Sequence, residues 1–121
     1  MNLKVIDCDF SVCKINKIGD VNFQDEFVFL SVTDQEISLV CDTSYVPKDC
    51  LAVEHGWKGF RVEGELDFSL IGILSKISAI LAEHKISIFV VSTFNTDYVL
   101  VKAEQMNDTI AVLKENGYQF L

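Results

Sequence analysis

Ser69-Leu-Ile-Gly-Ile-Leu-Ser-Lys-Ile-Ser-Ala-Ile-Leu-Ala-Glu-His84 is the stretch that decides the fold. Its apolar residues recur at steps of three and four, so they share one face of an α-helix over residues 69–84. That face consists of Leu70, Ile73, Leu74, Ile77, Ile80 and Leu81. Because an apolar face of this width needs a partner, we expect the helix to pack on a β-sheet.

Strands are predicted on both sides of this helix, where apolar and polar residues alternate and β-branched and aromatic side chains are frequent. They lie at residues 57–64, 86–93, 98–103 and 118–121. A second helix is predicted at 107–116, with a cap from Asn107 or Asp108 and an end at Gly117. This order predicts a ferredoxin-like unit of the α+β class, with an antiparallel sheet and helices on one face.

The first half carries a reduced copy of the same pattern. Its strands are predicted at residues 3–15, with a bend near Asp9, at 27–32 and at 36–41. Residues 31–40 align with 92–101 at a shift of 61 positions, but Phe10-Ser-Val12 aligns with Phe60-Arg-Val62 at a shift of only 50. The eleven missing residues equal about three helical turns, so the first copy lacks its first helix.

Two units are therefore expected, a degenerate one at residues 1–56 and a complete one at 57–121. The second helix of the degenerate unit is predicted in half-length form at residues 47–52, where Pro47 suits a first helical position. With so little helix, this unit cannot bury its own sheet. It is expected to lean on the second unit or on another chain.

Composition and charge exclude several classes of function. The 121 residues, half of them apolar, suit one compact domain or two small ones that share a core. Eighteen acidic and ten basic residues give a net charge of −8, so no nucleic-acid partner is expected. The chain contains neither an apolar run of membrane-spanning length nor a basic and then apolar leader, which predicts a cytoplasmic protein without a membrane partner.

The reactive residue types predict no catalytic centre, no metal site and no cofactor. Four cysteines without zinc-ligand spacing are expected to be reduced and buried: Cys8, Cys13, Cys41 and Cys50. His55 and His84 have no Ser or Cys partner within their own segments. Arg61-Val-Glu-Gly64 resembles the phosphate-binding turn of acylphosphatases, but acidic residues follow it where that enzyme needs an arginine, so we expect no enzyme.

Two stretches of the second half can form a ligand site. The turn from Gly64 to Gly72 precedes the long helix, whose first backbone N–H groups can bind an anionic group such as a carboxylate. Asp67 or Ser69 can cap this helix instead, although a cap satisfies only one or two of the four free donors. The second stretch, residues 92–97, is expected to approach the helix start at the edge of the sheet.

Asp97 allows two interpretations. It either stabilises the turn at Asn95-Thr96 or pairs with a cationic group of a ligand, where Glu65 could join it. In the second case, a carboxylate at one end and helix N–H donors at the other form a complementary cradle for a zwitterion.

These stretches resemble ACT-domain proteins, and within that family the small tandem-ACT proteins related to the Castor arginine sensors. The resemblance is carried by Trp57-Lys-Gly-Phe-Arg-Val-Glu-Gly-Glu-Leu-Asp-Phe-Ser-Leu-Ile-Gly-Ile-Leu74, by Ile86-Ser-Ile-Phe-Val-Val-Ser-Thr-Phe-Asn-Thr-Asp-Tyr-Val-Leu-Val101 and by Glu36-Ile-Ser-Leu-Val-Cys41. It implies a regulatory protein that binds a small amino acid at an interface between ACT units.

The resemblance also implies which residues contact the ligand. They belong to the turn before the first helix and to the strand after it: Gly64, Glu65, Asp67, Phe68, Ser69, Thr93, Phe94 and Asp97. Asp97 matches an acidic residue that helps to hold the ligand's side chain in the arginine sensors. Those sensors carry four ACT units and this chain carries two, so a complete site is expected to require a homodimer. In the first half of the chain, residues 31–36 are candidates for further ligand contacts.

A different class of function stays open, namely an interaction protein that binds no small molecule. Its exposed sheet edges would pair side by side into a dimer, and the turn before the long helix would then be architecture alone.

Overall fold

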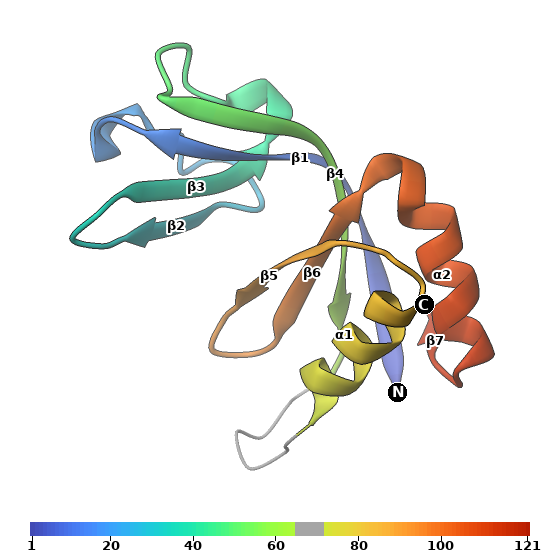
Figure 1. Ribbon diagram of the computed structural model, residues 1–121. Helices are drawn as coiled ribbons and strands as arrows, with labels where there is room; N and C mark the ends of the chain where they lie inside the picture. Colours follow the sequence, from blue (N-terminus) through green and yellow to red (C-terminus); the bar gives the residue numbers. More distant parts are fainter. Residues whose placement is uncertain (65–71) are drawn as a thin grey trace. The chain divides into compact units, whose positions relative to one another are not determined.

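The computed structural model describes residues 1–64 and 72–121, and Figure 1 shows its helices and strands. The elements are β1 (Asn2–Ile15), β2 (Phe29–Val32), β3 (Ile37–Asp42), β4 (Ala52–Val62), α1 (Ile73–Glu83), β5 (Ile88–Ser92), β6 (Asp97–Lys102), α2 (Met106–Glu115) and β7 (Gln119–Phe120). Short 3-10 helices lie at Ile18–Asp20, Thr43–Tyr45 and Ala103–Gln105. The strands predicted from the sequence are therefore present, with ends that differ by a few residues.

The chain forms two compact units. One, which we call the helical unit, contains Met1–Asp7 and Lys58–Leu121, and the other, the all-β unit, contains Cys8–Trp57. Strands β1 and β4 each contribute to both. The sequence predicted a division after residue 56, whereas Met1–Asp7 joins the C-terminal residues because Asn2 and Leu3 pair in parallel with Gln119 and Phe120. That the two halves are repeats of one unit remains a proposal.

The helical unit has the ferredoxin-like order β4, α1, β5, β6, α2, β7 that the sequence predicted. Its strands are ordered β7-β1-β4-β6-β5, so the start of β1 lies between β4 and β7 as an additional strand. Alternate residues of β4 and β6 pack with both helices in one core, which places α1 and α2 on the same sheet face. The fully buried members of this core are Leu3, Phe60, Val62, Ile77, Leu81, Val99, Val101 and Leu113.

The ends of α1 and α2 confirm part of the sequence prediction. Helix α2 ends before Gly117, which has a φ of +92°, as predicted. Its start differs, because Gln105 occupies the capping position without a side-chain hydrogen bond, so neither Asn107 nor Asp108 caps the helix. The described helix α1 begins at Ile73, after Gly72 with a φ of +81°, and the predicted start at Ser69 lies outside the described residues.

The all-β unit contains no α-helix anywhere between Cys8 and Trp57, so the predicted loss of the first helix is confirmed. The predicted short helix at residues 47–52 is wrong. A 3-10 helix forms earlier, at Thr43–Tyr45, because the Asp42 carboxylate accepts hydrogen bonds from the Ser44 N–H at 2.9 Å and the Ser44 hydroxyl at 2.7 Å. The chain then turns at Pro47, whose carbonyl accepts from the Cys50 N–H.

Side chains from the loops fill the place of the missing helix in the all-β unit. Cys13, Ile15, Leu39 and Cys41 form a small buried cluster, against which Val21, Val28 and Cys50 pack. The ring of Phe10 contacts those of Phe27 and Phe29, with centroids 6.1 and 6.5 Å apart. All four cysteines are reduced, as predicted, and burial is the largest cause that raises the pKa values of Cys8 and Cys41 to about 12.

The β2–β3 and β5–β6 hairpins have the same local geometry. In each turn a threonine N–H donates to the carbonyl three residues on, Thr33 to Glu36 and Thr93 to Thr96, both at 2.9 Å. Strands β3 and β6 also share one succession of half-buried and buried residues. These equivalences correspond to a shift of 60 positions and not the 61 of the sequence alignment. Since a one-residue slip reverses every side chain of a strand, Ile37 and not Glu36 is the counterpart of Asp97.

The two helices end in the same motif with different residues. After α1, Lys85 donates to Ala82 and Ile86 to Leu81, and after α2, Gly117 donates to Lys114 and Tyr118 to Leu113. Lys85 has a φ of +58°, a conformation that strains any residue with a Cβ atom.

We therefore expect Lys85→Gly to raise the free energy of unfolding by roughly 1 kcal/mol, and Gly117→Ala to lower it by a similar amount. Urea denaturation of both variants measures the two changes. Glu83→Ala, at an exposed position of the same helix end, serves as the control and should change stability little. A loss of stability in Lys85→Gly would contradict the strain at this position.

Candidate functional site

The β5–β6 turn lies against the end of β4. The hydroxyl of Thr96 donates a hydrogen bond of 2.7 Å to the carbonyl of Val62, two residues before Gly64. Gly64 has a φ of +96°, so the chain makes an unusual backbone turn as it leaves β4. The second stretch that the sequence singled out therefore contacts the end of β4, two residues before the first stretch begins at Gly64.

Thr93 and Thr96 build the turn itself. The Thr93 hydroxyl donates to the Thr96 carbonyl at 2.9 Å and accepts from the Thr96 N–H at 3.3 Å. Thr96 was not among the predicted site residues, although a threonine at each end of a four-residue turn is a recognisable signal for side-chain closure. Thr93, predicted as a ligand contact, has this structural role, and a contact with ligand stays a prediction.

Asp97 takes no part in closing the turn. It is half-buried at the start of β6, opposite Ser92 in the β5–β6 pair, and its carboxylate has no hydrogen-bond or ion-pair partner among the described residues. Asp97 shares the face of β6 that carries Val99 and Val101, which pack with the helices. The aspartate thus lies on the α1 side of the sheet, with a carboxylate available for another group.

The remaining predicted site residues fall into two groups. Phe94, at the tip of the turn, is 81% exposed. The structure does not describe residues 65–71, which include the predicted ligand contacts Glu65, Asp67, Phe68 and Ser69. In the described part of the chain, Gly72 occupies the capping position of α1. It has no side chain that could bond the first backbone N–H groups of the helix.

Arg61 lies on the opposite face of the sheet from Asp97. Its Nε donates to the Glu63 carboxylate at 2.9 Å, and its Nη1 lies 3.4 Å from the Tyr98 hydroxyl. The hydrogen bond from Arg61 lowers the pKa of Glu63 and raises that of Arg61. Because the guanidinium is already engaged there, the turn at Gly64 does not have the arginine that acylphosphatase-like chemistry requires.

His55 has a serine partner that its own segment does not contain. The Ser11 oxygen lies 2.7 Å from His55 Nδ1 and 2.8 Å from the Thr43 hydroxyl. Ser11 has no exposed surface, so no substrate can reach its oxygen. The cluster of Ser11, Thr43 and His55 satisfies polar groups inside the all-β unit.

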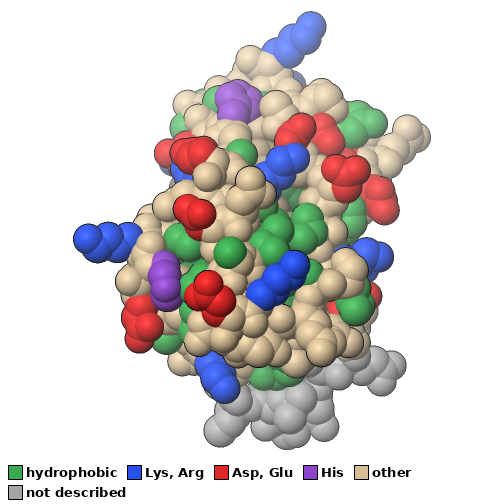
Figure 2. Space-filling view, turned by 90° about the vertical axis from the view of Figure 1, so that its right-hand side faces the viewer, with side chains coloured by type: hydrophobic (Ala, Val, Ile, Leu, Met, Phe, Trp, Pro, Cys, Tyr) green, Lys and Arg blue, Asp and Glu red, His purple; other side chains and the backbone are tan. Residues whose placement is uncertain are grey.

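Three further observations accompany this geometry. Figure 2 shows acidic side chains spread over one face with basic ones dispersed among them, in keeping with the net charge of −8. None of the described helices is long and apolar enough to cross a membrane. Within residues 1–64 and 72–121, no group of three His, Cys, Asp or Glu side chains could hold a metal ion.

Residues 52–115 match the family model of the ACT domain, and this chain belongs to the ACT-domain family. A curated relative, the human cytosolic arginine sensor for mTORC1 subunit 1, is 33% identical over 95 residues. That match covers 73% of this chain and 29% of the sensor, so the chain spans less than a third of the relative's length.

Two solved structures have the same fold. A protein of Agobacterium tumefaciens is 29% identical, with a TM-score of 0.88 over 99% of this chain and 91% of that one. The ligand-free regulatory subunit of aspartate kinase from Thermus thermophilus is 8% identical, with a TM-score of 0.65 over 93% of this chain and 95% of that one. The second similarity concerns the fold alone.

The hydrogen bond from Thr96 to Val62 can be tested by mutation. Thr96→Val removes the donor and leaves a part-buried carbonyl unpaired, so we expect the free energy of unfolding to fall by about 1–2 kcal/mol. Thr96→Ser keeps the hydroxyl and should lose much less. Chemical denaturation of both variants measures the difference, and equal losses would mean that the methyl group and not the hydrogen bond matters.

Proposed function

We propose that this chain is a regulatory protein that binds a small amino acid at an interface between ACT units. One observation carries the proposal: Thr96 ties the β5–β6 turn to the end of β4, beside the available carboxylate of Asp97. Membership of the ACT-domain family and the similarity to a protein named as an arginine sensor support it. The low-identity aspartate kinase subunit adds support for the fold only.

The proposed chemistry has two ends. The N–H groups at the start of α1 and the turn that begins at Gly64 would receive the ligand's carboxylate. Asp97 would pair with its amino group or with a basic side chain, because a carboxylate in a half-buried site favours a cation. Glu65, Asp67, Phe68, Ser69, Thr93 and Phe94 are proposed to complete the contacts.

The proposal includes neither catalysis nor a cofactor. Ser11 and His55 are the one Ser–His pair in direct contact among the described residues, and Ser11 is inaccessible. We further propose a homodimer in the cytoplasm. The relative named as cytosolic is more than three times as long as the region matched, and a second copy of this chain would supply further ACT units.

A thermal-shift series with the twenty amino acids tests the proposal. A ligand at about 100 times its Kd should stabilise the chain by roughly 2.7 kcal/mol, which raises the melting temperature by several degrees. Asp97→Ala should reduce the stabilisation by basic amino acids more than the stabilisation by neutral ones. Asp97→Asn keeps the size and removes the charge, so it separates electrostatic loss from loss of shape.

A chain that no amino acid stabilises would sink the sensor proposal. The second candidate, a ligand-free dimeric interaction module, would then be favoured by the unpaired edges of β2 and β5, which end the strand order. Sedimentation equilibrium tests this second candidate. The interaction module should be a dimer without added ligand, and replacement of Val90 in β5 by a charged residue or by proline should make it a monomer.

A further inference from the structure

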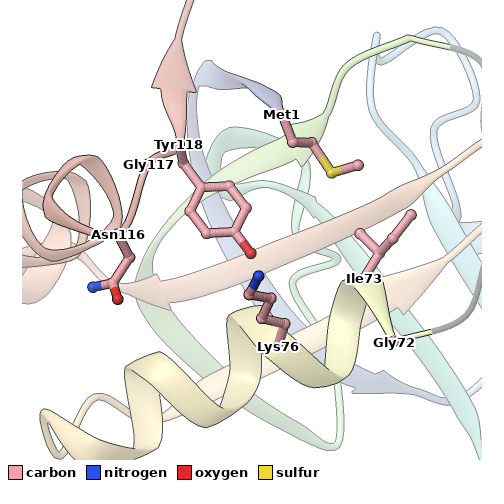
Figure 3. A pocket seen from close by; sticks show the side chains of 7 residues that line it. All are labelled: Met1, Gly72, Ile73, Lys76, Asn116, Gly117 and Tyr118. Atoms are coloured by element: carbon pink, nitrogen blue, oxygen red, sulfur yellow. The ribbon is translucent and has the colours of Figure 1, made fainter.

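A hollow lies in the helical unit, between the start of α1 and the end of α2. Its volume is about 320 Å³, within the range of small-molecule pockets. Figure 3 shows its lining, to which the first turn of α1, the residues after α2 and the chain start contribute. The residues that matter here are Met1, Gly72, Ile73, Lys76, Asn116 and Tyr118. Asp97 does not line this pocket, although the pocket borders the start of α1, which the proposed amino-acid site also uses.

The α1 side of this pocket is positive. Lys76 lies one turn into the helix, and its ammonium forms no ion pair with any described residue. The described first turn of α1 contains no acidic side chain, and Gly72 provides no side-chain cap. No acidic side chain of the described first turn neutralises the partial positive charge at this helix end, and the Lys76 ammonium lies beside it.

Tyr118 supplies the second, independent indication of a ligand. Its side chain is only 8% exposed, and burial raises its pKa, so the hydroxyl keeps its proton. No described residue forms a hydrogen bond with this hydroxyl. Figure 3 shows it pointing into the pocket, toward the Lys76 ammonium. The hydroxyl can donate to an acceptor in the pocket, a role that an ammonium cannot take.

The end of α2 does not offset this positive potential. Its last carbonyls already accept hydrogen bonds: Val112 from the Asn116 side chain at 2.8 Å, Leu113 from Tyr118 and Lys114 from Gly117, both at 3.1 Å. The negative end of that helix is thus covered by local donors. An oxyanion between Lys76 and Tyr118 would satisfy both groups at once.

We propose that this pocket binds a small organic oxyanion, a carboxylate or a phosphate. The anionic group accepts from the Tyr118 hydroxyl and pairs with Lys76 at the N-terminal end of α1. The apolar side chains of Ile73 and Met1 line the same hollow and contact the rest of the ligand. The pocket and the proposed amino-acid site share the start of α1 but no charged side chain, so variants of Tyr118 and Asp97 can separate the two proposals.

NMR titration of the full-length, ¹⁵N-labelled chain tests the pocket with isovalerate, inorganic phosphate and the neutral isosteric control isovaleramide. We expect saturable shifts of the Ile73 and Leu74 amides with the anions and none with isovaleramide. Stronger binding of isovalerate than of phosphate identifies carboxylates with an apolar part, and the reverse identifies phosphates. No saturable shift with either anion, or equal shifts with isovaleramide, overturns the proposal.

Two variants locate the binding. Lys76→Gln, at an exposed position, and Tyr118→Phe, which keeps the ring, should each weaken anion binding about 10-fold, as expected for the loss of a charge-assisted contact. Anion affinity unchanged in Lys76→Gln would overturn the proposal even if Tyr118→Phe failed to fold. Asp97→Ala should leave isovalerate binding intact, while Tyr118→Phe should leave any amino-acid response intact, so failure of one site is distinguishable from failure of the other.

Discussion

Burial of the apolar stripe of α1 against β4 and β6 is the constraint on which the helical unit depends. Ile77 and Leu81 are fully buried against Phe60, Val62 and Val99. Because this face can be satisfied only at one rotation of the helix, it also fixes which side chains of the first turn remain outside the core. The place of Lys76 in the pocket follows from that packing.

The same packing separates the chemistry of the sheet's two faces. Residues of even number in β4 and odd number in β6 turn toward the helices, so Asp97 shares the side of α1. Arg61 and Tyr98 have the opposite parity and engage each other on the other face. The carboxylate of Asp97, which no described residue engages, therefore lies on the helix side of the sheet, while Arg61 pairs with Glu63 on the other face.

The all-β unit covers its sheet without an α-helix. Rings and short side chains from its loops cover the strands, with Phe27 against Phe10 and Cys50 against the cluster around Cys13. Polar groups that a helix would have shielded are paired instead through Ser11, whose oxygen lies next to both Thr43 and His55. Burial of this network leaves those groups without access to substrate.

The sequence by itself determined the elements whose signals are local: the stripe of α1, the alternating strands, the end of α2 at Gly117, the missing first helix and the family. Only the tertiary structure decided contacts between distant residues, such as Thr96 with Val62, Ser11 with His55 and Tyr118 facing Lys76. It also decided the one-position shift between hairpins and the start of α1 after Gly72. Periodicity reports which face of an element is buried, whereas pairing register and side-chain approach depend on the packing of elements far apart in the chain.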